Sequence, residues 1–126
     1  MRRVGNPLRF LPPAGVMLVI FLLSAQPSSV FTRYTWWDAL WENGGHLLGY
    51  ALLGAAWWYA LRRPLPAWGW SVLYAFSDEW HQSFVPGRTA DWRDIIIDAL
   101  GAALAVCLLY LRSAHSQTFA SASPKE

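Results

Sequence analysis

The chain has 126 residues, enough for one domain, with a formal net charge of +2, 55% apolar residues and only 14% charged residues. Soluble domains average about 25% charged residues, so an ordinary soluble helical bundle is disfavoured, because too little polar surface is left to cover it. The small positive charge gives no support for nucleic-acid binding. The single cysteine, Cys107, excludes an intramolecular disulfide and a thiolate metal cage.

Four long apolar runs predict the architecture. They cover residues 10–25, 45–61, 65–84 and 94–111, and each carries few ionisable groups. A membrane-spanning helix needs about 20 residues, within a range of about 17–25. These runs are at the short end of that range, so flanking residues must complete each membrane-spanning helix. We therefore expect an all-α membrane protein whose single domain, residues 1–112, is a bundle of four transmembrane helices with short connecting loops.

The first run also resembles a signal peptide, because basic residues precede it and small residues follow it. Cleavage after Ala25 would place Leu23 at the −3 position, where a small residue is preferred. We therefore favour an uncleaved span, with Pro12 and Pro13 in its first turn, where a missing N–H costs little. The segment that follows, residues 30–44, carries aromatic residues beside acids and is a candidate interfacial helix.

The second run is expected to begin at Gly44 and to end before a tight, proline-rich turn at Arg62. His46 and Tyr50 are four residues apart, so they share a helix face. Gly54 lies in a patch of small residues that suits close contact with another helix.

The end of the third run and the start of the fourth together hold five of the eight acidic residues. Asp78 and Gln82 share one helix face, whereas Glu79 and His81 point in other directions. Either several neighbours receive these groups or the helix end unwinds. The Val-Pro-Gly-Arg segment at residues 85–88 predicts a turn whose third residue needs a positive φ.

The fourth run is expected to start with Asp91 as a cap and Asp94 in the first turn, where a carboxylate meets the positive end of the helix dipole. Asp98 lies one turn deeper, on a small and polar face that it shares with Gly101 and that should point into the bundle. The Ser- and Ala-rich tail, residues 113–126, is expected to be disordered and cytoplasmic.

The distribution of basic residues predicts the orientation. Seven of the ten flank the ends of the runs on one side: Arg2, Arg3, Arg9, Arg62, Arg63, Arg112 and Lys125. Lys and Arg favour the cytoplasmic side of a membrane, so both termini should be cytoplasmic and the loops 26–44 and 85–94 should face outward. The tryptophans agree with this orientation, because they gather near both expected membrane interfaces.

Several motifs resemble the VanZ-like family of small bacterial membrane proteins. They are Ser24-Ala25-Gln26-Pro27, His46 with Tyr50, the run AFSDEWHQSFVPGR at 75–88, and Asp94, Asp98 and Gly101. Three positions depart from the family pattern: Glu42 stands where Asp is usual, Asn43 where Lys is usual, and Asp98 where Asn is frequent. The resemblance implies a multi-pass protein of the bacterial inner membrane, in a family named after a protein linked to reduced susceptibility to the glycopeptide antibiotic teicoplanin.

We expect these polar groups to form an extracytoplasmic site that binds an envelope lipid or a lipid-linked precursor, with a role in cell-envelope or antibiotic response. The expected binding residues are Arg88, Asp78, Gln82, Asp94, Asp98 and Tyr50, with Arg88 as the natural partner for a phosphate or for one of the acids. The alternative is an intramembrane acid/base enzyme acting on a lipid-linked or glycan substrate, with His46, Glu79 and His81 as catalytic residues. Metal binding and proton transport are lesser alternatives. No cofactor, metal or nucleic-acid partner is expected.

Overall fold

The computed structural model of the chain describes residues 6–27 and 36–122, with side chains described for 6–27 and 43–117. These residues form one short 3-10 helix and four α-helices, with no strand among them. The elements are η1 (Pro7–Phe10), α1 (Leu11–Ser24), α2 (Trp36–Leu61), α3 (Pro64–Gln82) and α4 (Trp92–Ala122). Within these residues, the predicted all-α fold with four α-helices is confirmed.

Capping residues and prolines set the helix boundaries. The Asn6 side chain accepts a hydrogen bond of 3.0 Å from the N–H of Leu8 and so caps η1. Prolines occupy the first turns of α1 and α3, where an N–H would have no helical partner. After α2, Arg62 adopts a φ of 54° and Arg63 is extended, which reverses the chain within two residues. The tight turn predicted at this point is confirmed.

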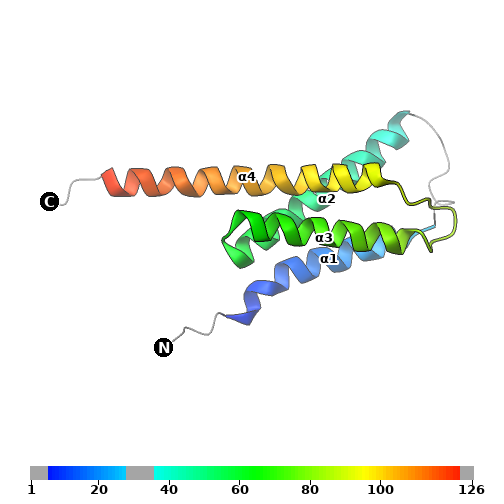
Figure 1. Cartoon of the computed structure of the whole chain (residues 1–126), viewed down its shortest axis with the longest axis horizontal. Coiled ribbons are helices and arrows are strands. Elements are labelled where there is room, and N and C mark those ends of the chain that lie inside the picture. The colour runs from blue at the N-terminus through cyan, green and yellow to red at the C-terminus, as the bar shows by residue number, and fades with distance from the viewer. Residues whose placement is uncertain (1–5, 28–35, 123–126) are drawn as a thin grey trace.

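The chain runs back and forth along one axis, so the start of α1 and the end of α4 lie at the same end of the bundle (Figure 1). We call this the terminal end, and we call the opposite end, where α3 connects to α4, the loop end. The most extensive helix pair is α2 with α4. At the terminal end, α4 extends past the other helices (Figure 1).

Two glycines allow α2 and α4 to cross closely. A Cβ added at Gly54 would lie 2.8 Å from the carbonyl oxygen of Ala102. A Cβ added at Gly101 would overlap the carbonyl oxygen of Leu47. Since both obstacles are backbone atoms, neither position accepts a side chain unless the helices move apart. The close helix contact predicted at Gly54 is confirmed.

The core of the bundle is small, and its centre is formed by Tyr50, Leu53 and Ala75. Large apolar side chains instead cover the outside of the bundle. Leu18 of α1 and Leu104 of α4, for example, are 58% and 56% exposed. Extensive apolar surface of this kind marks a membrane or partner interaction, because water-soluble monomers keep such patches small.

The described residues contain two helical segments that are long and apolar enough to cross a membrane, Pro7–Ser24 and Trp92–Gln117. The other two helices, α2 and α3, are long enough but interleave tryptophans and tyrosines with their aliphatic residues. These aromatic residues, together with the polar groups of the loop end, lower the hydropathy of both helices. That all four helices cross a membrane therefore stays a prediction.

Two helices extend beyond their predicted limits. The second helix begins at Trp36, so the residues before Gly44 continue α2 instead of forming a separate interfacial helix. Each glycine in a helix costs about 1 kcal/mol relative to alanine. The helix continues through Gly44 and Gly45 because the many other residues of α2 offset that cost. The fourth helix continues to Ala122, although disorder is expected from Ser113 onward. Extending a formed helix needs no new nucleation, which explains the helical tail; the last four residues lie outside the described part.

Candidate functional site

Asp78, near the end of α3, is the centre of a buried hydrogen-bond chain. Its Oδ1 accepts a bond of 2.6 Å from the hydroxyl of Ser24, at the end of α1, and its Oδ2 accepts a bond of 3.1 Å from Gln82 Nε2. Asp78 and Gln82 are 4% and 2% exposed. Burying a carboxylate is costly unless its oxygens receive donors. These bonds satisfy Asp78 and hold the end of α1 against α3.

Arg88 extends this chain into the loop between α3 and α4. The loop turns where the N–H of Arg88 donates to the carbonyl of Val85 at 3.1 Å, and Gly87 has a φ of 78°. The predicted turn, with glycine at its third position, is therefore confirmed. The guanidinium donates from Nη1 to Gln82 Oε1 and from Nε to the carbonyl oxygen of Gln26, each at 3.1 Å.

Both partners of the Arg88 guanidinium are neutral. Among the side chains that the structure describes, no carboxylate lies within ion-pair distance of Arg88. A guanidinium has five N–H donors in a planar fork, and this one is partly exposed at the loop end. Two of these five donors are used, so Arg88 keeps three donors and its positive charge for a further partner.

Glu79 connects the end of α3 to the start of α4. Its carboxylate is 5% exposed and accepts the backbone N–H of Asp91. Asp91 in turn accepts the N–H of Arg93 at 2.9 Å, which is the geometry of a helix cap, and Asp94 lies in the first turn. The predicted roles of Asp91 and Asp94 at the start of α4 are thus confirmed. Glu79 thus holds the backbone of Asp91, the capping residue, in place.

A second polar pair joins α2 to α4. His46 Nδ1 lies 3.0 Å from Asp98 Oδ1, and Asp98 is 1% exposed. Asp98 and Gly101 lie on the buried face of α4, as predicted. The carboxylates of Asp94 and Asp78 also act on His46 electrostatically. Three acids, Asp98, Asp94 and Asp78, therefore act on the His46 imidazole.

Tyr50 lies one turn after His46 and is 1% exposed. The strongest charges acting on its hydroxyl are those of Asp78 and Asp98. Within the described part of the chain, this hydroxyl has no hydrogen-bond partner. An unpaired buried polar group costs about 1–3 kcal/mol, so packing alone does not account for a tyrosine here. Tyr50 therefore offers an unused donor between the two halves of the network.

Comparison with known protein families identifies the chain. A model of the VanZ/LLP1 family matches residues 2–113, a range that contains every polar residue described above. The chain belongs to the VanZ/LLP1 family. Searches of curated proteins and of solved structures found no match.

The VanZ/LLP1 motif residues at the end of α3 turn toward different neighbours. Asp78 faces α1, Glu79 faces the start of α4, and the ring of His81 lies against Phe21 with centroids 4.5 Å apart. This confirms the first of the two arrangements that the helix spacing allows. The three residues expected to be catalytic, His46, Glu79 and His81, each have a separate partner, and no hydrogen bond joins them.

The possible metal ligands in the described part of this VanZ/LLP1 chain do not come together in one group. No group of three or more His, Cys, Asp or Glu side chains is placed there to hold a metal ion. Cys107 is exposed on α4.

Sequence reasoning does not identify two members of the network. Ser24 supplies a hydroxyl to Asp78, and Gln26 supplies a carbonyl oxygen to Arg88. Their signal is the polar Ser-Ala-Gln-Pro stop after the first apolar run, which also belongs to the family pattern. If these polar residues had been interpreted as partners for the acids of α3, the sequence would have predicted that the end of α1 lies beside the site.

Proposed function

We propose that this VanZ/LLP1 protein is an integral protein of the bacterial inner membrane, with four membrane-spanning helices and both termini in the cytoplasm. Its loop end faces the extracytoplasmic side and binds the anionic headgroup of an envelope lipid or of a lipid-linked precursor. Such binding would connect the protein to the cell-envelope or glycopeptide response that the family resemblance implies.

The separation of charge along the bundle supports this orientation. Arg9, Arg62 and Arg63 lie at the terminal end, whereas buried acids such as Asp78 and Asp98 belong to the loop end. Lys and Arg are enriched on the cytoplasmic side. Ionisable groups at membrane depth persist where they have partners, and the hydrogen bonds of Asp78 and Asp98 meet that need.

The observation that carries the binding proposal is the Arg88 guanidinium with neutral partners only. Arginine binds phosphate through charge-assisted and often bidentate hydrogen bonds. Gln82 and Gln26 hold the guanidinium in place before any ligand arrives, so binding loses less side-chain freedom. A phosphate group at the membrane surface is the anion that fits this charge and position.

Lipid binding by purified protein in detergent tests the proposal. We expect the wild type to bind phosphatidylglycerol or a polyprenyl phosphate more tightly than phosphatidylcholine. Arg88→Gln should weaken binding of the anionic lipids about tenfold or more, because a hydrogen bond to a charged group contributes about 1.5–3 kcal/mol and about 1.4 kcal/mol is tenfold in affinity. Arg88→Lys should be intermediate, because it keeps the charge and loses the fork.

The matched control is Arg93→Gln, which removes the same charge from an exposed residue in the first turn of α4. We expect it to change the affinity less than about twofold, as for an exposed charge. Thermal unfolding of Arg88→Gln shows whether the fold survives loss of the bonds to Gln82 and Gln26. Equal losses in a folded Arg88→Gln and in Arg93→Gln would contradict a specific role for Arg88.

The acid/base alternative rests on one feature, the His46 imidazole held by Asp98, since a carboxylate can orient a histidine for proton transfer. In the same assay, this alternative requires a chemically altered lipid after incubation, and the alteration should disappear in His46→Ala. The binding proposal predicts that the lipid is recovered unchanged.

A further inference from the structure

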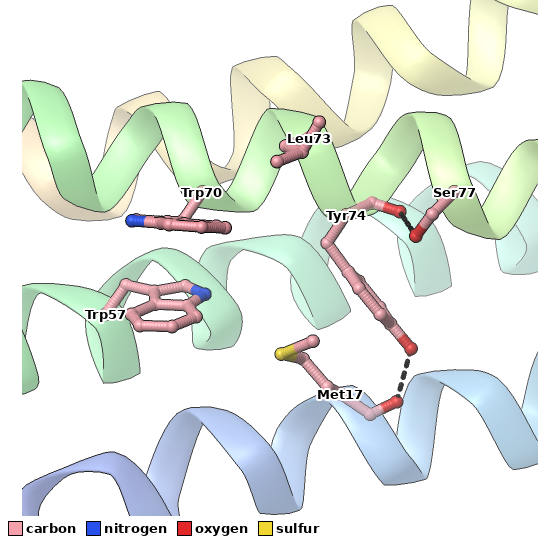
Figure 2. Close-up of a pocket in the computed structure, with 6 residues that line it drawn as sticks. All are labelled: Met17, Trp57, Trp70, Leu73, Tyr74 and Ser77. Atoms are coloured by element: carbon pink, nitrogen blue, oxygen red, sulfur yellow. Dashed lines mark hydrogen bonds between the residues drawn. The ribbon is translucent and has the colours of Figure 1, made fainter.

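A groove opens between α1 and α3, with α2 as its floor (Figure 2). Its volume is about 300 Å³, at the lower end of the range of about 300–1,000 Å³ for ligand pockets. The lining residues are mostly apolar and come from three helices: Met17, Trp57, Trp70, Leu73, Tyr74 and Ser77. None of them belongs to the hydrogen-bond network around Asp78 and Arg88.

The groove is closed toward the loop end. There the Tyr74 hydroxyl donates to the carbonyl oxygen of Met17 at 2.6 Å (Figure 2), and beyond this bond His81 packs on Phe21. Toward the terminal end, α1 and α3 move apart (Figure 1). A hydrocarbon chain would therefore enter the groove from the side, between α1 and α3.

Two arginines, Arg9 in η1 and Arg63 just before α3, lie at the terminal end of these helices. The Arg9 guanidinium lies 5.0 Å from the centroid of the Phe10 ring, and Phe10 meets Trp57 edge-on at 6.3 Å. Trp57 in turn stacks on Trp70 at 5.7 Å (Figure 2). Ring contacts therefore connect Arg9 to the groove wall through Phe10 and Trp57. Arg63 directly precedes α3, about two helical turns before Trp70. Neither arginine has a carboxylate partner among the described side chains.

We propose that the groove holds one acyl chain of an anionic glycerophospholipid, with the lipid phosphate bound by Arg9 and Arg63. The apolar wall accepts the chain, and the two guanidinium groups select a negative headgroup. The indole N–H of Trp57 is buried without a partner in the described residues, so it can donate to a lipid ester oxygen. This site lies at the opposite end of α1 from Arg88 and shares only the membrane location with the function proposed above.

Native mass spectrometry of the purified protein, titrated with phosphatidylglycerol or phosphatidylcholine, counts the lipids bound and so separates the two sites. The wild type should bind two phosphatidylglycerol molecules. Arg9→Gln should lower the affinity of one of them at least fivefold. Leu73→Trp should do the same by filling the groove. Arg88→Gln should leave the groove lipid in place and remove the other.

The controls change α4, which does not line the groove. Arg112→Gln removes a charge at the same end, and Leu108→Trp enlarges a side chain that is 54% exposed, close to the 58% of Leu73. Both should retain the groove lipid with less than twofold change. The inference is overturned if Arg9→Gln and Arg112→Gln weaken binding equally, if Leu73→Trp has no effect in a folded protein, or if phosphatidylcholine binds the groove as tightly as phosphatidylglycerol.

Discussion

Replacing Gly101 with alanine should cause one of the largest losses of stability in this protein. The new Cβ would overlap the carbonyl oxygen of Leu47, so α2 and α4 would have to move apart at this crossing. Overpacking of this kind costs about 1–3 kcal/mol, occasionally more. We expect Gly101→Ala to lower the free energy of unfolding by about 2–3 kcal/mol, measured by equilibrium unfolding in mixed detergent and dodecyl sulfate micelles.

The control for this prediction is Gly69→Ala in α3. A Cβ at Gly69 meets nothing within 4 Å, so only helix propensity acts, and alanine exceeds glycine by about 0.8–1.0 kcal/mol in a helix interior. Gly69→Ala should therefore be neutral or slightly stabilising. If the two substitutions shift the unfolding free energy in the same direction and by the same amount, the close crossing of α2 and α4 is wrong.

Removing the Asp78 side chain should have a comparable effect for a different reason. In Asp78→Ala, the amide of Gln82 and the hydroxyl of Ser24 lose the buried carboxylate as an acceptor, and α1 loses one of its hydrogen bonds to α3. Bonds to a charged group contribute about 1.5–3 kcal/mol each, partly offset because a costly buried carboxylate also disappears. We expect a net loss of about 3 kcal/mol in the free energy of unfolding.

Two further substitutions make this prediction specific. Ser77→Ala changes the adjacent residue, which is exposed and bonds only to the carbonyl of Tyr74 in its own helix, so its effect should stay within about 0.5 kcal/mol. Asp78→Asn keeps an oxygen for Ser24 but loses the charge, so it should fall between the two. Stability unchanged in Asp78→Ala would show that the buried chain does not hold α1 in place.

Local chemistry was predictable from the sequence. The directions of Asp78 and Glu79 follow from the 3.6-residue period of a helix. The positive φ of Gly87 follows from the Pro-Gly turn, and the Asp91 cap follows from its place just before an apolar run. Each of these features depends on residues within one or two turns, so the sequence alone determines them.

Pairing between helices was not predictable in the same way. Ser24 and Asp78 are 54 residues apart, and His46 and Asp98 are 52 apart. The expected faces were correct, but which partner each face meets depends on how the helices cross. At that crossing Gly54 and Gly101 each meet the backbone of the opposite helix, and the small-residue pattern predicts that these faces come close without showing which residues they meet. The helical tail was missed because its composition resembles a linker while its position continues an existing helix.

The central claim is that the loop end lies outside the cell membrane and the terminal end lies inside, and labelling with a membrane-impermeant maleimide tests it most directly. Cys107 is the only cysteine, so Cys107→Ala provides a background for single cysteines at two exposed positions, Thr89→Cys in the α3–α4 loop and Leu65→Cys at the start of α3. We predict that Thr89→Cys is labelled in intact cells and that Leu65→Cys is labelled only after permeabilisation. The reverse pattern, or equal labelling of both in intact cells, would contradict the account.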